Sequence, residues 1–177
     1  QWHQAGYVLP KVAINISPGQ LLDENFSTIV NALREQYGIN PERIVFEITE
    51  SADIEHFNLI STVLRDLKGQ GYRFSLDDFG TGYSSMTHFK RLPFSQVKID
   101  QSFIADMDSN EDSLAIVEVV LAMARSLKLE VIAEGVETPA QLDILNQLGC
   151  TGYQGYLFSK PLSVQAIMSR FSRDIEW

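Results

Sequence analysis

The stretch FSLDDFGTGYSS (Phe74–Ser85) ends a short apolar run with two adjacent aspartates and continues into a glycine-containing loop. A run of this kind is typical of a strand that is buried on both faces of a parallel sheet. Asp77 and Asp78 repel each other, and a purely structural strand end needs neither of them. The pair is either a turn or cap before Gly80 and Gly82, or part of a site that binds cations.

Similar short, β-branched runs recur along the chain, and longer segments with helical spacing lie between them. Apolar residues share one helical face over 22–37, 60–67 and 114–124, Thr138–Gln141 has the composition of a capping box, and a last helix is expected after Ser163. This alternation predicts an α/β fold with a parallel sheet. The expected strands are Lys11–Ile16, Arg43–Thr49, Tyr72–Asp78, Gln96–Asp100, Glu130–Ala133 and approximately Thr151–Tyr156.

Two architectures satisfy this alternation of strands and helices. One is an open, doubly wound sheet, and the other is a (β/α)8 barrel that lacks two of its units. A complete barrel typically takes about 250 residues. The 177 residues of this chain therefore correspond to one domain with room for roughly six βα units.

The composition limits the class of protein. The net charge is −9 and the basic residues are scattered, so no surface for a DNA or RNA duplex is expected. No apolar run reaches the roughly 20 residues of a membrane span. The single cysteine, Cys150, cannot form an internal disulfide, which fits a cytoplasmic protein, and no two of the three histidines have the spacing of a zinc site. An acidic chain can still bind a phosphate compound when metal ions supply the positive charge.

A polar residue lies near the carboxyl end of every expected strand. In a barrel these ends open onto one face, where active sites are found. Carboxylate and carbonyl oxygens suit Mg²⁺ or Mn²⁺, and this many carboxylates suits two ions. Asp77 and Asp78 reach one site only if the strand ends there, because adjacent strand residues point to opposite faces, and residues 79–82 supply that break. In chain order the residues are Asn15, Glu47, Asp77 with Asp78, Lys98, Glu134 and Gln154.

Each of these side chains also has a purely structural interpretation, so the prediction of a site rests on the whole set. A buried polar group in a strand requires a partner, whether or not it is functional. Asn15 can cap the helix after Ser17, Glu47 can pair inside the sheet, Lys98 can pair with Asp100 or an acid on a neighbouring strand, Glu134 and Glu137 can complement a helix dipole, and Gln154 can bond the backbone.

Six motifs in this order resemble the EAL-domain family of bacterial phosphodiesterases and cyclic di-GMP receptors. They are NIS at Asn15, FEITES at Glu47, DDFGTGYSS at Asp77, KID at Lys98, AEGVE at Glu134 and QGY at Gln154, and they extend over about residues 11 to 161. The resemblance implies a TIM-barrel-like (β/α) fold, here incomplete, with about six of the eight βα units. It also implies a two-metal reaction in which water opens cyclic di-GMP to linear pGpG, with Mg²⁺ or Mn²⁺ as the metal.

The resemblance also implies a role for each matching residue. The family's metal ligands match Asn15, Glu47, Asp77, Asp78 and Glu134, with Asp77 bridging the two ions. Lys98 matches the residue that orients the attacking water, and Glu134 is in addition a candidate general base. Substrate-contact positions match Gln154, Asp78 and Glu137, and Glu50 matches the residue that anchors the loop Phe79–Ser85, which the family links to metal binding and dimerisation.

The Glu-Ala-Leu motif that names the family is absent from residues 1–177. In the family it lies on the first strand, upstream of the Asn15 motif, and its glutamate is a metal ligand. We therefore expect residues 1–177 to form a single EAL-type domain fragment that lacks the first one or two strands. Unpaired strand edges would then favour a homodimer. A GGDEF or sensor domain is expected upstream in a longer parent protein, which other domains can anchor to a membrane.

Three functions remain open from the sequence. The first is a metal-dependent phosphodiesterase that hydrolyses cyclic di-GMP. The second is a non-catalytic receptor that binds cyclic di-GMP without cleaving it. The third is a non-catalytic assembly module built from the residual barrel. Without the resemblance, the residues alone indicate a metal-dependent hydrolase of a phosphate-containing compound.

Overall fold

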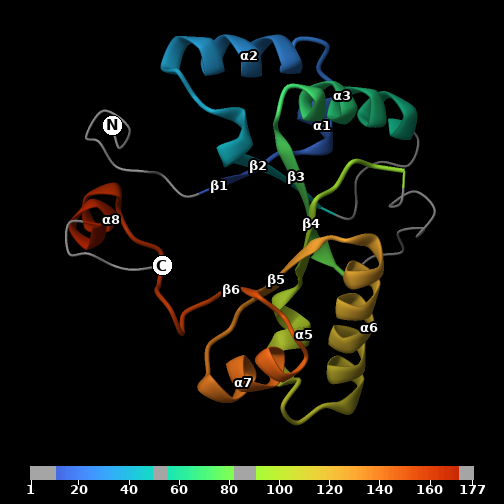
Figure 1. Ribbon diagram of the computed structural model, residues 1–177, viewed down its shortest axis with the longest axis vertical. Helices are drawn as coiled ribbons and strands as arrows, with labels where there is room; N and C mark the ends of the chain where they lie inside the picture. The colour runs from blue at the N-terminus through green and yellow to red at the C-terminus, as the bar shows by residue number, and fades with distance from the viewer. Residues whose placement is uncertain (1–10, 50–55, 82–90, 172–177) are drawn as a thin grey trace.

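The computed structural model describes residues 11–49, 56–81 and 91–171 (Figure 1). Six parallel strands form one sheet in the order in which they occur in the chain. The α/β prediction is confirmed, and each strand lies within about a residue or two of its expected place. The strands are β1 (Val12–Asn15), β2 (Ile44–Thr49), β3 (Arg73–Phe79), β4 (Gln96–Ile99), β5 (Glu130–Glu134) and β6 (Gly152–Gln154).

Helices connect the strands, and Figure 1 shows α1 to α3 beside β1–β3 and α5 to α7 beside β4–β6. The short α5 was not expected from the sequence. None of the helices in the described ranges has the length and apolar character needed to cross a membrane. Their bounds are α1 (Pro18–Leu21), α2 (Phe26–Tyr37), the 3-10 turn η2 (Pro41–Arg43), α3 (Phe57–Gly69), α5 (Gln101–Asp106), α6 (Glu111–Leu127), α7 (Pro139–Gln147) and α8 (Val164–Phe171).

The strand order decides between the two architectures. A doubly wound sheet reverses its strand order at a switch point, whereas this sheet runs from β1 to β6 without a reversal. Six sequential parallel strands with helical connections form part of a barrel wall. The TIM-barrel-like fold with about six units is therefore confirmed, and the doubly wound alternative is wrong.

The two faces of each strand serve different purposes, because successive side chains point to opposite sides of the sheet. On β3, Phe74 and Leu76 are buried in a hydrophobic core that includes Leu64 of α3. The intervening Ser75 and Asp77 are also buried, on the face opposite to that core. The barrel interior is therefore unusually polar near the carboxyl ends of the strands, which is where the candidate site lies.

The predicted capping box starts α7 as expected. Thr138 Oγ1 accepts a hydrogen bond from the backbone N–H of Gln141, and the Gln141 side chain accepts one in return from the backbone N–H of Thr138. The buried Gln141 amide also donates to the Ile104 carbonyl of α5. These bonds hold the loop after β5 against α5 and so fix the position of the last residue of β5, Glu134.

Helix α2 differs from the other long helices because none of its residues is buried. Its apolar residues border a groove of about 380 Å³ that also contacts β1, and Ile29 and Leu33 are 50% and 46% exposed. Within the described residues, β1 pairs with β2 on one side only. The shared helical face was predicted correctly from the sequence. Phe26 and Val30 on this face pack against the core, whereas Ile29 and Leu33 stay exposed in the described part of the chain.

Candidate metal centre

A single lysine on β4 connects acids from three other strands. The Lys98 ammonium lies 3.0 Å from a carboxylate oxygen of Glu47 on β2, 3.0 Å from one of Asp77 on β3, and 2.7 Å from one of Glu134 on β5. The lysine side chain is only 4% exposed. We call these four residues the Lys98 cluster. Its ion pairs span four strands, so the sheet itself brings together residues that are distant in sequence.

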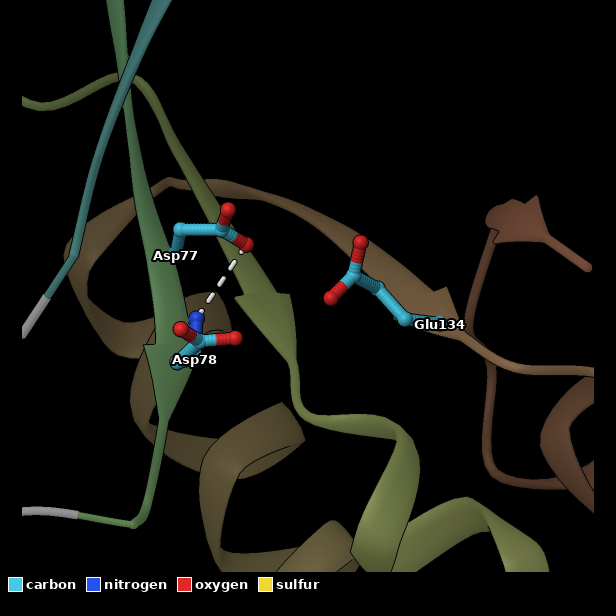
Figure 2. A group of neighbouring side chains, drawn as sticks. All are labelled: Asp77, Asp78 and Glu134. Carbon is cyan, nitrogen blue, oxygen red and sulfur yellow. Dashed lines mark hydrogen bonds between the residues drawn. The ribbon is translucent and has the colours of Figure 1, made fainter. Parts of the chain in front are cut away.

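Asp78 adds a further carboxylate to the cluster through an unusual backbone conformation. Its φ angle is +55°, in the left-handed region, and the pairing of β3 with β4 shifts register between Leu76 and Phe79. A residue in this conformation interrupts the regular alternation of side chains between the two faces of the sheet. Asp77 and Asp78 therefore lie on the same side as Glu134 (Figure 2), and the Asp78 backbone N–H donates to Asp77 Oδ1 at 3.1 Å.

The sequence predicted that strand β3 would be interrupted at residues 79–82, and this position was wrong. Strand β3 continues to Phe79, and the irregularity lies inside the strand, at Asp78 itself. Aspartate adopts a left-handed φ more readily than most residues, but which of two adjacent aspartates does so depends on the surrounding structure. The consequence for the site, with both carboxylates on one side, is the one that was expected.

The acids are close enough to bind one cation together. Asp77, Asp78 and Glu134 each offer a carboxylate oxygen, and these oxygens all lie within 4.8 Å of one another. Oxygens that share an Mg²⁺ ion at about 2.1 Å lie about 3 to 4 Å apart, so small side-chain rotations suffice. A hard divalent cation prefers such a set of oxygen donors. Lys98 offsets only one of the negative charges that these carboxylates carry when ionised. The remaining negative charge fits a divalent metal.

Burial changes the proton affinity of the site's ionisable groups. Desolvation raises the pKa of Glu134, and its hydrogen bond to Lys98 offsets this only in part. Desolvation and the neighbouring charges of Asp77 and Asp100 raise the pKa of Asp78. Burial alone would lower the pKa of Lys98, but hydrogen bonds to three carboxylates raise it above its usual range. The lysine is therefore a permanent cation, while two of the acids bind protons more readily than usual.

Several structural interpretations of these residues do not apply. Ser17, not Asn15, caps α1, and it forms a capping box with Gln20. For Lys98, pairing with acids on neighbouring strands is confirmed, but pairing with Asp100 is not, because Asp100 caps α5 by accepting from the Ser102 N–H at 2.9 Å. Glu134 ends β5, and α7 starts only at residue 139. The turn after β3 uses the backbone carbonyl of Asp78, to which the Thr81 hydroxyl donates, so it leaves the Asp78 side chain free for the site.

The remaining predicted site residues lie around the cluster or outside the described residues. Asn15 is in register with Glu47 on the adjacent strand, but it is exposed and borders the groove beside α2. Glu137 and Gln154 are exposed and line a pocket of about 700 Å³ beside Glu134. We call this hollow the carboxyl-end pocket. Glu50 lies outside the described residues, as does most of the loop after β3.

The carboxyl-end pocket is also lined by residues that were not predicted as site residues, and three of them carry a charge or an aromatic ring. Asp100 follows β4, and Tyr156 and Lys160 follow β6. Asp100 was considered only as a partner for Lys98, but the Asp-x-Ser pattern before α5 is itself the signal of a helix cap at the strand end. Tyr156 belongs to the QGY motif, but strand-end polarity indicated only Gln154 of that motif. Lys160 lies beyond the motif, in neither a strand nor a helix.

The comparison with known proteins gives a consistent result. A family model described as "EAL domain" matches residues 1–161. The bifunctional diguanylate cyclase/cyclic di-GMP phosphodiesterase MucR of Pseudomonas aeruginosa is 35% identical over 95% of this chain and 24% of its own length. Two solved structures are also similar. The PaMucR phosphodiesterase in complex with c-di-GMP has a TM-score of 0.88 and 36% identity, covering 94% of this chain and 67% of that chain. The manganese/cy-diGMP complex of Klebsiella pneumoniae BlrP1 has a TM-score of 0.82 and 30% identity, covering 90% of this chain and 41% of that chain.

The coverage is unequal between this chain and its relatives. The chain spans about a quarter or less of the length of the curated relatives it matches. The shared region contains every described strand and the whole Lys98 cluster, because the family match covers residues 1–161.

Proposed function

The chain belongs to the EAL domain family, and on that premise we propose that its Lys98 cluster is the centre of a metal-dependent phosphodiesterase that opens cyclic di-GMP to linear pGpG. Related structures contain cyclic di-GMP, and one of them contains manganese. The chain's own observation in support is the convergence of Glu47, Asp77 and Glu134 on one buried ammonium. One carboxylate is enough to neutralise this ammonium, so the other two leave negative charge that a cation can balance.

The proposed ligands of Mg²⁺ or Mn²⁺ are the carboxylates of Glu47, Asp77, Asp78 and Glu134, with the amide oxygen of Asn15 from β1. Bound divalent ions lower the pKa of water and neutralise the charge that develops on a phosphate. Asp77 lies between Lys98 and the other aspartate, with its carboxylate bonded to both residues. This central position would let Asp77 help to hold both metal ions.

Lys98 and Glu134 supply the proton chemistry of the proposal. If the carboxylates held cations, Lys98 would lose the hydrogen bonds that raise its pKa, and the N–H groups of Lys98 would be available to other acceptors. It then donates a hydrogen bond that orients the attacking water. Glu134, whose pKa is raised chiefly by burial, holds a proton better than an exposed carboxylate does and acts as the general base. Glu137 and Gln154 bind substrate in the carboxyl-end pocket beside it.

The test is a chromatographic assay for pGpG with the purified chain, cyclic di-GMP and either Mg²⁺ or Mn²⁺. We expect metal-dependent product that EDTA abolishes. Asp77→Asn removes the shared carboxylate and should eliminate turnover. Asp143→Asn, at an exposed position on α7, is the matched control and should leave it unchanged.

Unchanged turnover in the Asp77 variant would contradict the two-metal assignment. Equilibrium binding of cyclic di-GMP without any hydrolysis would support the receptor function instead. Neither binding nor hydrolysis would leave the assembly module as the function of this stretch.

A further inference from the structure

Ser75 is a buried polar residue next to the Lys98 cluster that the proposed chemistry does not use. It lies on β3, two residues before Asp77, so its side chain is on the same face of the sheet as that carboxylate. The residue is completely buried, with an exposed fraction of 0%. Its hydroxyl oxygen has no hydrogen-bond partner among the residues that the structure describes. The barrel interior therefore contains an unpartnered hydroxyl beside the candidate metal centre.

An unpartnered hydroxyl in this position destabilises the metal-free protein. A buried polar group that gives up its bonds to water and gains none in the fold lowers the stability of the native state. Most buried polar groups in native proteins are hydrogen-bonded, so an exception calls for a physical explanation. Filling the space does not supply one, because an alanine methyl group would occupy most of the same volume without burying a polar atom.

The register of the sheet places Glu47 beside Ser75. Glu47 on β2 and Ser75 on β3 are Cα partners in the parallel ladder, and neighbouring strands lie about 4.8 Å apart. On the other side, Ser75 is paired with Gln96 of β4, which is uncharged and only partly buried. A hydrogen bond to an ionised acceptor is roughly twice as strong as one between neutral groups. Glu47 is therefore the stronger of the two acceptors within reach of this hydroxyl.

Glu47 has an oxygen available for this bond. Its Oε2 accepts a hydrogen bond from the Lys98 ammonium at 3.0 Å, and its Oε1 accepts none from a residue in the described ranges. Under the proposed function, Glu47 binds a cation, and its carboxylate turns away from Lys98 to do so. Carboxylates that bind metal ions are in turn held by hydrogen bonds from neighbouring protein groups.

We propose that Ser75 is a positioning residue for the metal centre and that it acts through Glu47. When Glu47 binds a cation through one carboxylate oxygen, the Ser75 hydroxyl donates a hydrogen bond to the other oxygen and fixes the orientation of the carboxylate. The hydroxyl is thus unpartnered only in the metal-free protein. This inference rests on the proposed function for the presence of a metal ion, but it concerns metal affinity and not bond cleavage.

The experiment measures Mn²⁺ binding by calorimetry and thermal unfolding in EDTA, and neither measurement requires turnover. Ser75→Ala should weaken Mn²⁺ binding about 10- to 100-fold. Its Tm in EDTA should equal that of the wild type or exceed it by up to about 4 °C, because the variant no longer buries an unpartnered hydroxyl. Ser75→Thr keeps the hydroxyl and should retain most of the Mn²⁺ affinity. Ser61→Ala is the matched control and should bind Mn²⁺ as the wild type does, because Ser61 is a buried serine on α3, which packs against the opposite face of the sheet.

A double-variant comparison tests whether Ser75 acts through Glu47. In Glu47→Ala, the carboxylate that Ser75 would orient is absent, so the further change Ser75→Ala should weaken Mn²⁺ binding little or not at all. The same change should have its full effect in the wild-type background. A full effect in both backgrounds would overturn the assignment of Glu47 as the partner.

The outcomes separate this inference from the proposed function. Mn²⁺ binding and hydrolysis by the wild type, with equal Mn²⁺ affinity in Ser75→Ala, overturn the positioning role alone. A lower Tm of Ser75→Ala in EDTA also overturns it, because the hydroxyl would then already have a partner in the metal-free protein. Mn²⁺ binding that depends on Ser75, without hydrolysis, supports the positioning role and contradicts the phosphodiesterase. Absence of Mn²⁺ binding by the wild type overturns both.

Discussion

Removal of the buried cation at the centre of the site has a consequence that needs no substrate to observe. In Lys98→Met, the carboxylates of Glu47, Asp77 and Glu134 lose their shared partner while their own charges remain. The exposed fractions of these side chains are 8%, 12% and 15%, so water replaces little of what is lost. Without metal, we therefore expect the variant to be much less stable than the wild type.

The expected size follows from the burial of the ion pairs. Removing one partner of a buried pair typically costs about 3 to 5 kcal/mol. The three pairs do not triple this value, because the carboxylates share one ammonium and Glu134 can take up a proton instead. For a chain of this length, 1 kcal/mol shifts Tm by about 2 to 4 °C. Lys98→Met should thus lower Tm in EDTA by about 6 to 20 °C.

The assay is thermal unfolding followed by circular dichroism, in EDTA and then in Mn²⁺. Lys68→Met is the control, because Lys68 is exposed and, among the described residues, its ammonium donates a hydrogen bond only to the Pro93 carbonyl, at 3.3 Å. The Tm of this variant should stay within about 2 °C of the wild-type value. Mn²⁺ should raise the Tm of Lys98→Met more than that of the wild type, since metal replaces the missing charge. A Tm for Lys98→Met in EDTA equal to that of the control would refute the account of a cation-dependent acidic centre.

Three other predictions follow from the same geometry. Asp78→Asn keeps a residue that tolerates the φ of +55° and removes a repelling charge. The Tm in EDTA should therefore rise by about 2 °C, and calorimetry should show at least about tenfold weaker Mn²⁺ binding. A lower Tm would contradict this. Raised pKa values at Glu134 and Asp78 mean that protons must leave before metal binds, so Mn²⁺ affinity should increase as the pH rises above the ordinary titration range of carboxyl groups, by up to about tenfold per pH unit for each proton released. The stability of the metal-free protein should change in the opposite direction, because groups with raised pKa values lose their stabilising contribution as the pH rises. An Mn²⁺ affinity that does not change with pH would count against both carboxylates as ligands. Gly155→Ala places a Cβ atom 2.1 Å from the Val136 carbonyl oxygen and should cost more than about 2 kcal/mol in urea unfolding, whereas Gly69→Ala meets no atom within 4 Å and should be neutral or stabilising.

Much of this fold could be read from the sequence because its elements are locally determined. The six β-branched runs and the Thr138 capping box each depend on residues within one element, and they lie where they were expected. The order of the strands could be resolved only in three dimensions, since alternation of strands and helices is compatible with both a barrel and a doubly wound sheet.

The residues of the Lys98 cluster could be predicted from the sequence, but their geometry could not. Strand-end polarity selected Glu47, Asp77, Lys98 and Glu134, which the structure joins through ion pairs. The left-handed conformation of Asp78 arises from a register shift between β3 and β4, which is a property of two strands together. Hydrogen bonds to a loop about twenty residues earlier in the chain place Tyr156 beside Glu134, and the QGY motif by itself does not show that the two residues are neighbours.

The most direct test of the central claim is an X-ray structure of the chain crystallised with Mn²⁺, with anomalous data collected at the manganese edge. We predict anomalous density within about 2.2 Å of carboxylate oxygens of Asp77, Asp78 and Glu134. We also predict that Lys98 no longer contacts all three of its carboxylate partners. Absence of anomalous density at these residues, with the Lys98 ion pairs intact in saturating Mn²⁺, would contradict a metal centre at this site.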